Sequence, residues 1–559
     1  MLLYNLAFAN ADICGEKELY FRGGERRDNG LFVKSGEVVS FDTYFNCFSH
    51  VKYKKYTNVN EVTLKLDTEG IGVVRIYLYA KDGIKLLSET RFDGNVEIKT
   101  DISRLPDDGF IYFNLEASED CLIKSGGWHA ECETKNVKIG LVICTYRREQ
   151  YLKRNLTAIT EYMKSLSERF FDVYVIDNGQ TVSENFGDGV TVIPNENTGG
   201  SGGFTRGIKE VAKGDYTHFL LMDDDILFDV RTLYRTYSLL SVLKEDYADA
   251  SVGGAMLVLD RPYLQEEMGA NWTGNSIKSQ NSRLDARKQE TLYLNETLCE
   301  PDYNAWFFMC MPVSAPEKYG YPLPFFIRCD DIEYGLRACE NIITTSGISV
   351  WHEGFDVKYS AGIEYYIKRN ELITSARFPR KKGAFANFKK LVLAVGSELM
   401  QQRYYAVNLV FKAYEDFYKG ADYFMHLDCT KKHREIRALC PEFIDDKEIK
   451  SKYGIDVDLA RVEKHGKWSF KNFITLNGYL IPKCFYKKET AQVDMINFEY
   501  DDFFAKRRVL QYNPVAKAGF VTEIKKSELF KAWGKLIKFL FVTLFKYRKT
   551  AKGYAKIEN

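Results

Sequence analysis

The sequence predicts an α/β protein with an open, mainly parallel sheet between an N-terminal β-sandwich and a C-terminal helical region. Alternating apolar and polar residues fill about the first 135 residues. Strand-like apolar runs then alternate with helical stretches to about residue 360, and helical spacing dominates afterwards. A chain of 559 residues is too long for one ordinary core, so roughly two to four domains are expected.

Bulk composition excludes several classes of protein. The 78 basic and 77 acidic residues leave a net charge of +1, so nothing argues for a nucleic-acid partner. We expect neither a membrane-spanning helix nor a signal peptide, because no apolar run is long enough and the N-terminus lacks the required pattern. The 12 cysteines contain no Cys-x-x-Cys pair, which argues against structural zinc and fits free thiols in a reducing cytoplasm.

Residues 1–135 are predicted to form a β-sandwich or jelly-roll-like domain. Val62, Leu64 and Leu66 alternate with polar residues, and the same pattern recurs at 74–79. Turn-forming sequences separate these runs, as is typical of short antiparallel strands.

Residues 136–360 are predicted to form the parallel sheet. Strands are expected at 137–144, 171–176, 190–193 and 218–222, and helices at roughly 150–168 and 204–213. Ligands of such sheets bind beyond the carboxyl ends of the strands. The polar residues predicted at that edge are Arg148, Asp177, Asn197, Asp223, Asp224 and Asp225.

Three consecutive carboxylates, Asp223 to Asp225, end the fourth strand. Oxygens of Asp223 and Asp225 are spaced to reach one divalent ion, and Mg²⁺ or Mn²⁺ would neutralise a nucleotide diphosphate leaving group. The alternative is a surface acidic turn. His352, which follows the β-type run 348–351, would supply a third ligand; a lone His is otherwise more often structural.

A glycine-rich block, 197–203, precedes the second helix. It lacks the Lys and Ser/Thr of a phosphate loop. Gly199 and Gly200 would allow the backbone to approach a donor sugar or a diphosphate, and the alternative is a flexible connection.

A second acidic pair, Asp330 and Asp331, follows an aromatic stretch that contains two prolines. Displacement at a sugar carbon needs a base for the acceptor hydroxyl, and proximity raises the pKa of one carboxylate of a close pair. Either residue could also cap the helix through Tyr334, and both roles can coexist.

Two further residues are candidates for acceptor binding. Trp306 could stack on a sugar ring, or it could belong to the core. Glu267 is assigned to acceptor hydroxyls from its position alone.

Residues 361–520 are predicted to be mainly helical, and 521–559 form a basic amphipathic tail. In the tail, apolar residues recur at helical spacing among many lysines. This pattern is typical of a membrane-surface helix, here 521–556, and equally of a helix docked on the protein's own core.

Taken together, these motifs resemble the bacterial galactofuranosyltransferases of glycosyltransferase family 2. The resemblance rests on the Asp223–Asp225 run, the glycine-rich block, the Asp330-Asp331-x-Glu333-Tyr334-Gly335 element and Trp351-His352. It includes Asp42-Thr43-Tyr44-Phe45-Asn46 of the N-terminal region and becomes vague after about residue 400.

The resemblance implies a GT-A catalytic domain between a β-sandwich and C-terminal helices, a UDP-galactofuranose donor, inversion at the anomeric carbon and a divalent cation. It would make Asp331 the base with Asp330 beside it, and Phe307 stands where the family has a second Trp. The implied ligands are Asp223, Asp225 and His352 for the metal, Arg148, Asp177 and Asn197 for UDP, and Trp306 for the acceptor.

We therefore expect an inverting glycosyltransferase, dependent on Mn²⁺ or Mg²⁺, that transfers galactofuranose to a glycan or glycolipid acceptor at the inner face of the cell membrane. Whether it forms a homo-oligomer is left open. The alternatives are the same fold with another nucleotide-sugar donor, or a non-catalytic glycan-binding or scaffold protein of polysaccharide assembly. A nucleotidyltransferase is disfavoured, because no loop suits a triphosphate.

Overall fold

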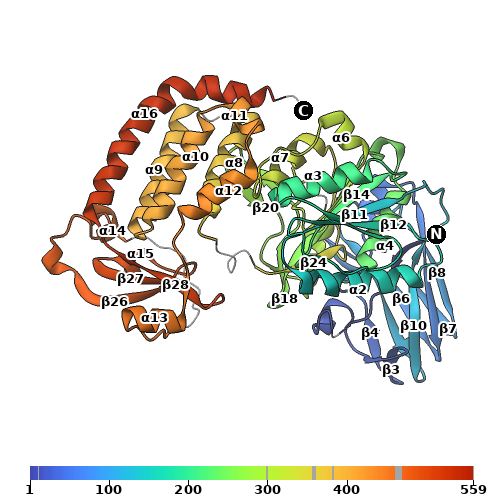
Figure 1. The fold of residues 1–559 in the computed structure, drawn as a ribbon. Coiled ribbons are helices and arrows are strands. Elements are labelled where there is room, and N and C mark those ends of the chain that lie inside the picture. The colour runs from blue at the N-terminus through green and yellow to red at the C-terminus, as the bar shows by residue number, and fades with distance from the viewer. Residues whose placement is uncertain (11, 298–299, 355–359, 381–382, 460–468, 558–559) are drawn as a thin grey trace.

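The computed structural model describes the chain except for residues 11, 298–299, 355–359, 381–382, 460–468 and 558–559 (Figure 1). The predicted α/β fold class is confirmed: a β-rich N-terminal part, a mixed α/β middle part and a largely helical C-terminal part follow one another along the chain.

The N-terminal part consists of two antiparallel sheets that share one core. The first, in spatial order, contains β2 (Glu25–Arg27), β3 (Gly30–Val33), β10 (Cys121–His129), β5 (Glu61–Glu69) and β8 (Val96–Asp101), with β1 (Leu2–Asn5) beside β10. The second contains β4 (Val38–Ser40), β9 (Phe110–Ala117), β6 (Ile71–Ala80) and β7 (Gly83–Asp93). Val62, Leu64 and Leu66 of β5 are buried, which explains the alternation seen in the sequence.

The middle part is built on a seven-stranded sheet. Its strands, in spatial order, are β13 (Val190–Pro194), β12 (Phe171–Asp177), β11 (Ile139–Thr145), β14 (His218–Asp223), β22 (Phe308–Pro312), β16 (Ser251–Gly253) and β23 (Ile342–Ile343). The first four are parallel, so their carboxyl ends meet at one edge.

The helices α2 (Glu149–Ser165) and α3 (Gly199–Val211) cover opposite faces of this sheet (Figure 1). Leu141 of β11 shares a core with α2, whereas its neighbour Val142 shares a different core with α3. Successive side chains of a strand point to opposite faces, so a run of apolar residues such as β11 needs cover on both sides.

A five-stranded sheet brings the two distant halves of the predicted metal site together. Its strands are β15 (Leu227–Phe228), β24 (Ser349–His352), β17 (Ala255–Val258), β18 (Arg261–Glu267) and β21 (Leu284–Asp285). Because β15 begins just after Asp225 and pairs with β24, the end of β24 lies beside the three aspartates.

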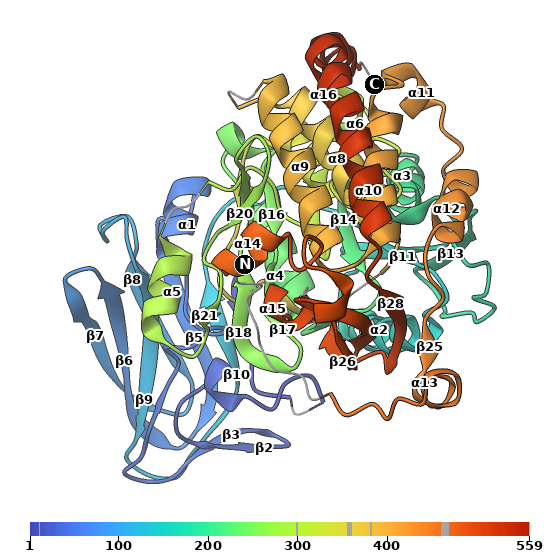
Figure 2. The ribbon, with the colours of Figure 1, turned by 90° about the vertical axis from the view of Figure 1, so that its left-hand side faces the viewer.

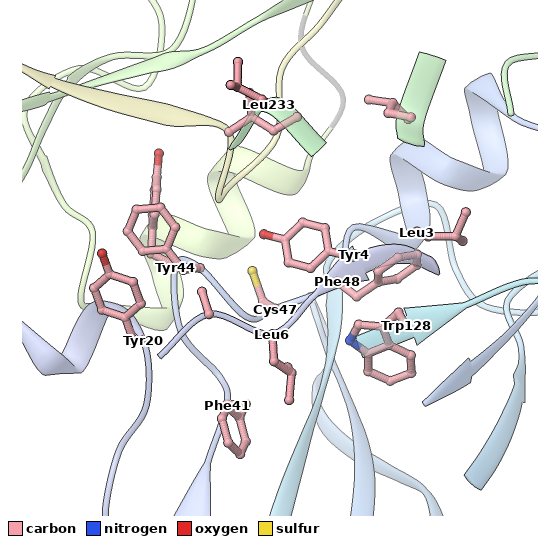
Figure 3. Packing of buried hydrophobic residues seen from close by; sticks show 14 of the residues in the cluster. Leu3, Tyr4, Leu6, Tyr20, Phe41, Tyr44, Cys47, Phe48, Trp128 and Leu233 are labelled. Carbon is pink, nitrogen blue, oxygen red and sulfur yellow. The ribbon is translucent and has the colours of Figure 1, made fainter. Parts of the chain in front are cut away.

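The N-terminal and middle parts are joined through a common core. Leu233 of α4 (Arg231–Ser241) belongs to the same buried cluster as Leu3 and Tyr4 (Figure 3). The buried guanidinium of Arg235 lies 3.8 Å from the ring centre of Tyr4 and donates to the carbonyls of Asn5, Phe45 and Gly347. A buried cation with this many acceptors fixes the two parts against each other.

The C-terminal part differs in one respect from the helical region expected at 361–520. It begins with α8 (Ile363–Arg377), α9 (Ala384–Met400) and α10 (Tyr404–Phe417), but it also contains a four-stranded sheet. That sheet consists of β25 (Ile444–Asp445), β28 (Ala518–Glu523), β27 (Lys506–Asn513) and β26 (Lys487–Asp494) (Figure 2). Its strands carry many charged residues and no clear alternation, so the sequence pattern did not indicate them.

The tail forms one long helix, α16 (Lys526–Ala555), that packs along α8 and α9 (Figure 1). One stripe of the helix is buried in the core of the helical region, including Leu529, Phe539 and Tyr547. A neighbouring apolar stripe stays exposed, with Phe530 at 62% and Phe545 at 81%. Among the described residues, no helix has both the length and the apolar character needed to cross a bilayer.

Candidate active site

A cavity of about 620 Å³ lies beyond the carboxyl ends of the parallel strands. Seven of the residues singled out from the sequence line it: Gly200, Asp223, Glu267, Trp306, Asp330, Asp331 and His352. They come from six different elements or loops, so the fold brings together residues that are up to about 150 positions apart in the sequence.

Asp223, Asp225 and His352 form a potential metal site. One ligand atom from each residue lies within 4.8 Å of the others. The His352 Nε2 atom is 3.3 Å from Asp225 Oδ1 and 3.7 Å from Asp223 Oδ2. Two carboxylates and one imidazole are suitable ligands for Mn²⁺ or Mg²⁺, so these residues fit the expected cation.

The tautomer of His352 is compatible with this role. Its Nδ1 atom lies 2.8 Å from the carbonyl oxygen of Glu353. A carbonyl can only accept, so Nδ1 carries a proton and Nε2 is the ring nitrogen that faces the two carboxylates.

The middle aspartate, Asp224, is turned away from the cavity and holds the loop. Its carboxylate accepts a hydrogen bond of 2.6 Å from Thr145 Oγ1 and one of 3.2 Å from Arg148, and its carbonyl accepts from Asn155. Burial raises the pKa of Asp224 to about 6, while Thr145 and Arg148 oppose that shift. Arg148 also donates to Asp225 Oδ2 at 2.7 Å, so one guanidinium orients two of the three carboxylates.

The segment before Asp330 has an unusual backbone. Phe326, Arg328 and Cys329 have φ angles of 74°, 68° and 63°, in the left-handed region that costs non-glycine residues energy. The side-chain amide of Asn370 on α8 donates to the carbonyls of Ile327 and Arg328 at 2.9 and 2.8 Å. Strain held in place in this way is common at functional sites.

This segment delivers both acids to the first turn of α7 (Asp330–Ala338), and Cys329 is the residue at its N-cap. The expectation that Asp330 or Asp331 caps this helix is wrong: both lie in the first turn, one and two residues after the N-cap. Both carboxyl groups are half-buried at the cavity wall.

Desolvation raises the pKa values of both Asp330 and Asp331 above the usual aspartate range. For Asp330, the charge of Asp331 adds to this rise. For Asp331, the backbone amide of Ile332 and the charge of Arg328 partly offset it. A carboxylate with a raised pKa is a stronger base than an ordinary one.

The glycine-rich block starts α3 and contacts the segment that carries the second acid pair. A Cβ on Gly199, whose φ is 73°, would lie 2.0 Å from the carbonyl oxygen of Phe326, so only glycine fits there. A Cβ on Gly200 would lie 4.0 Å from Asp330 Oδ2. Gly200, in the first turn of α3, lines the cavity, while the amides of Gly199 and Ser201 donate to Asn197 and to the carbonyl of Phe326. A helix N-terminus favours anionic groups.

The two predicted acceptor residues both line the cavity, in different ways. Trp306 is only 5% exposed and packs edge-on against Phe204 and Tyr334, so most of its ring belongs to the core. Glu267 accepts a hydrogen bond of 2.8 Å from Ser279, and burial raises its pKa to about 7.

Asp177 and Asn197 do not line the cavity. The Asp177 carboxylate accepts from the backbone amides of Gly179, Thr181 and Val182, at 2.7 to 2.9 Å. Asn197 accepts from the amide of Gly199 at 3.1 Å. Both organise the loops at the sheet edge, and their predicted contacts with UDP remain predictions.

Three features of the site were missed in the sequence. Thr145 and Asn155 hold Asp224, but nothing in their spacing marks them. Arg328, two residues before Asp330, lines the cavity and could have been noticed as a cation beside an acid pair. Glu371 reaches the cavity from α8, which no local pattern indicates.

Two segments of the chain match models of known families. Residues 21–131 match the family model described as galactofuranosyltransferase 2 N-terminal, and residues 141–308 match that of glycosyl transferase family 2. The resemblance to galactofuranosyltransferases is confirmed. The middle part thus carries a glycosyltransferase domain, as the acid clusters indicated.

Two curated relatives extend over most of the chain. Galactofuranosyltransferase GlfT2 of Mycolicibacterium smegmatis is 28% identical over 425 residues, which cover 69% of this chain and 64% of that protein. GlfT2 of Mycobacterium tuberculosis is 26% identical over 434 residues, or 70% of this chain and 67% of that protein. The chain therefore spans somewhat less than two thirds of the first relative's length.

Among solved structures, a mannosyltransferase from Pyrobaculum calidifontis in complex with GDP-Man and Mn²⁺ aligns with a TM-score of 0.30 and 12% identity. The alignment covers 56% of this chain and 82% of that one.

Proposed function

We propose that this protein is an inverting, metal-dependent galactofuranosyltransferase that uses UDP-galactofuranose and a hydroxyl of a glycan or glycolipid acceptor. The observation that carries the proposal is one cavity lined by two acid clusters of different chemistry. Asp223 and Asp225 face His352 as a ligand set, and the pKa values of Asp330 and Asp331 are raised. The similarity to GlfT2 supports the choice of galactofuranose.

The donor would bind at the edge of the parallel sheet. Asp223, Asp225 and His352 would hold Mn²⁺ or Mg²⁺, which when bound neutralises charge on the leaving diphosphate. Arg148 keeps Asp225 oriented, and the backbone amide of Gly200, in the first turn of α3, would be offered to the phosphates.

Asp331 would act as the general base. Its carboxylate takes the proton of the acceptor hydroxyl while the oxygen attacks the anomeric carbon, and the bond from that carbon to the UDP oxygen breaks. The attack from the side opposite the leaving group inverts the configuration. Asp330, whose pKa is raised partly by the charge of Asp331, would stay protonated and donate a hydrogen bond.

Release of UDP tests this proposal. The protein is mixed with UDP-galactofuranose, UDP-galactopyranose or UDP-glucose, with Mn²⁺ or EDTA, and with a galactofuranose-terminated acceptor. We expect turnover only with the furanose donor and only with metal. Turnover with another donor would keep the enzyme class and overturn the donor, and no UDP release or UDP binding at all would favour a non-catalytic glycan-binding protein.

We also propose that the exposed apolar stripe of α16 contacts an anionic membrane surface, which would place the enzyme at the inner face of the cell membrane. The stripe includes Phe530, Trp533, Ile537, Phe541, Leu544 and Phe545. Exposed Lys531, Lys535, Lys538 and Lys546 lie among them. An apolar stripe flanked by lysines suits insertion between anionic headgroups.

Sedimentation with lipid vesicles tests this contact. The wild type should bind vesicles containing phosphatidylserine more strongly than neutral ones, and Phe541→Ser with Phe545→Ser should release it without loss of folding, because both side chains are exposed. Equal binding by the variant would mean that α16 serves only as a packed helix.

A further inference from the structure

A second cavity, of about 390 Å³, opens between α8 and α9 next to the candidate active site. Glu364, Lys368 and Glu371 of α8 line one side, and Lys390 and Glu398 of α9 line the other. None of these residues takes part in the proposed transfer reaction.

The two cavities have one lining residue of α8 in common. Glu371 lines both, and Ile367, one turn earlier on α8, lines the catalytic one. On the opposite side stands the hairpin of β19 (Ala270–Trp272) and β20 (Ile277–Ser279): Ile277 and Ser279 line the catalytic cavity, and Asn275 in its turn lines the second. One helix face and one hairpin thus border both cavities.

The wall that α8 contributes to the two cavities is longer than a single small chemical group. Glu364 and Glu371 are seven residues apart on α8, and a helix rises 1.5 Å per residue, so the wall they mark is about 10 Å long. An occupant that enters from the acids can therefore extend well beyond the reacting sugar.

Glu398 marks the second cavity as a polar binding site. Its side chain is only 8% exposed, and its Oε2 atom has no hydrogen-bond partner among the described residues. A buried carboxyl oxygen without a partner is costly, and a bound ligand that donates a hydrogen bond removes that cost. Burial raises the pKa of Glu398 to about 7, so the group can both donate and accept near neutral pH.

The other carboxylates are only loosely engaged. The Glu364 Oε2 atom is 3.9 Å from the Lys368 amine, and the Glu371 Oε2 atom is 4.0 Å from that of Lys390. Charge-assisted hydrogen bonds are about 2.7–2.9 Å long, so these oxygens retain capacity for ligand hydroxyls.

The charged residues that line the second cavity indicate which class of molecule can bind there. Three carboxylates beside two lysines disfavour an anion, and the charged lining disfavours a hydrocarbon. The positive charges of Lys368 and Lys390, which also line the cavity, disfavour a cation. A neutral molecule with many hydroxyl groups, each both donor and acceptor, matches the lining.

We propose that the cavity between α8 and α9 is an extended acceptor subsite, in which Glu364, Glu371 and Glu398 bind the sugar units that precede the one receiving galactofuranose. This inference rests on the proposed function for the identity of the glycan. The proposed subsite would make the enzyme prefer longer acceptors to shorter ones.

The test compares two acceptors in the full-length protein. kcat/KM is measured with a galactofuranosyl disaccharide and with a hexasaccharide for the wild type, Glu364→Gln, Glu398→Gln and the control Glu415→Gln, which changes an exposed residue of α10. We expect the hexasaccharide-to-disaccharide ratio to fall about two- to tenfold in Glu364→Gln and Glu398→Gln, because the amide replaces one of the two carboxyl oxygens and so removes one hydrogen-bond acceptor. The control should keep the wild-type ratio.

Binding of the hexasaccharide, measured by calorimetry without donor, separates this inference from the proposed function. Weaker binding to Glu364→Gln than to Glu415→Gln supports the subsite even if no UDP-sugar is turned over. If transfer proceeds but neither the ratio nor the binding changes in Glu364→Gln and Glu398→Gln, the subsite is overturned and the transfer function stands. Glu364 is half-buried and Glu398 is buried. A similar loss of the ratio in both variants would therefore exclude a folding defect at one of the two positions as its cause.

Discussion

The two acid clusters of the cavity differ in how their charges are balanced. Around Asp223–Asp225, one guanidinium donates to two carboxylates, a threonine hydroxyl donates to Asp224, and an imidazole faces the other two. Around Asp330 and Asp331, the balancing groups are a backbone amide and the charge of exposed Arg328. On the proposed function, the first cluster would hold a cation, whereas the second would hold a proton.

The largest effect is expected from Asp331→Asn, which keeps the shape of the side chain and removes its basicity. Turnover should fall by about 10²–10⁴, the usual contribution of a general base. Asp330→Asn is the matched comparison and should cost less, because an amide still donates a hydrogen bond. Steady-state kinetics of the two variants check this, and an equal or larger loss in Asp330→Asn would reverse the assignment of the base.

A smaller effect is expected from His352→Ala, which removes the one imidazole of the first cluster. The affinity for Mn²⁺ should fall by at least about tenfold, since even groups that only support a ligand are worth 10- to 100-fold. Metal titration of UDP release measures this. His426, whose side chain is 79% exposed, offers the control substitution His426→Ala. An unchanged Mn²⁺ dependence in His352→Ala would remove His352 from the ligand set.

Gly199→Ala tests the connection between the glycine-rich block and the second cluster. The left-handed backbone alone should cost about 1–2 kcal/mol of stability, and the contact with Phe326 adds to that. Denaturant unfolding gives the free energy. An added Cβ on Gly534 of α16 would have no other group within 4 Å, so Gly534→Ala should instead stabilise the protein by about 0.5–1 kcal/mol. Similar changes in both variants would contradict the close packing of α3.

The smallest effect concerns the pH profile. The pKa of Asp331 lies above the usual ~3.9 of aspartate, and the base works only when deprotonated, so activity should fall as the pH drops through that raised value. Removing the positive charge with Arg328→Gln raises the pKa further and should move the acid limb upward by less than about one unit, because Arg328 is exposed and screened. Arg104→Gln, 87% exposed in the N-terminal part, is the control. A downward shift in Arg328→Gln would contradict this electrostatic account.

The sequence predicts the first cluster better than the second. The strands that end in Thr145, Asp177 and Asp223 carry continuous apolar runs, and a parallel sheet collects their carboxyl ends at one edge, so the cluster follows from local pattern plus topology. His352 was found by its motif, but its position depends on the pairing of β15 with β24, which no local pattern encodes.

The parts that sequence analysis missed depend on tertiary contacts. The left-handed segment before Asp330 is held by Asn370, more than 40 residues away, and left-handed conformations of Phe326 and Cys329 are disfavoured locally. The second cavity lies between α8, α9 and a hairpin turn, and the sequence of each element alone does not indicate a binding site. The charged strands of the C-terminal sheet have the same limitation, since their packing rather than their pattern selects the β conformation.

The most direct test of the difference between the clusters is calorimetric titration of UDP with Mn²⁺ into Asp225→Asn and Asp331→Asn. The account predicts that Asp331→Asn binds UDP with wild-type affinity in the presence of Mn²⁺, while Asp225→Asn loses the part of the affinity that EDTA abolishes in the wild type. Equal loss in both variants, or metal-dependent binding that survives in Asp225→Asn, would contradict the separation of cation binding from proton transfer.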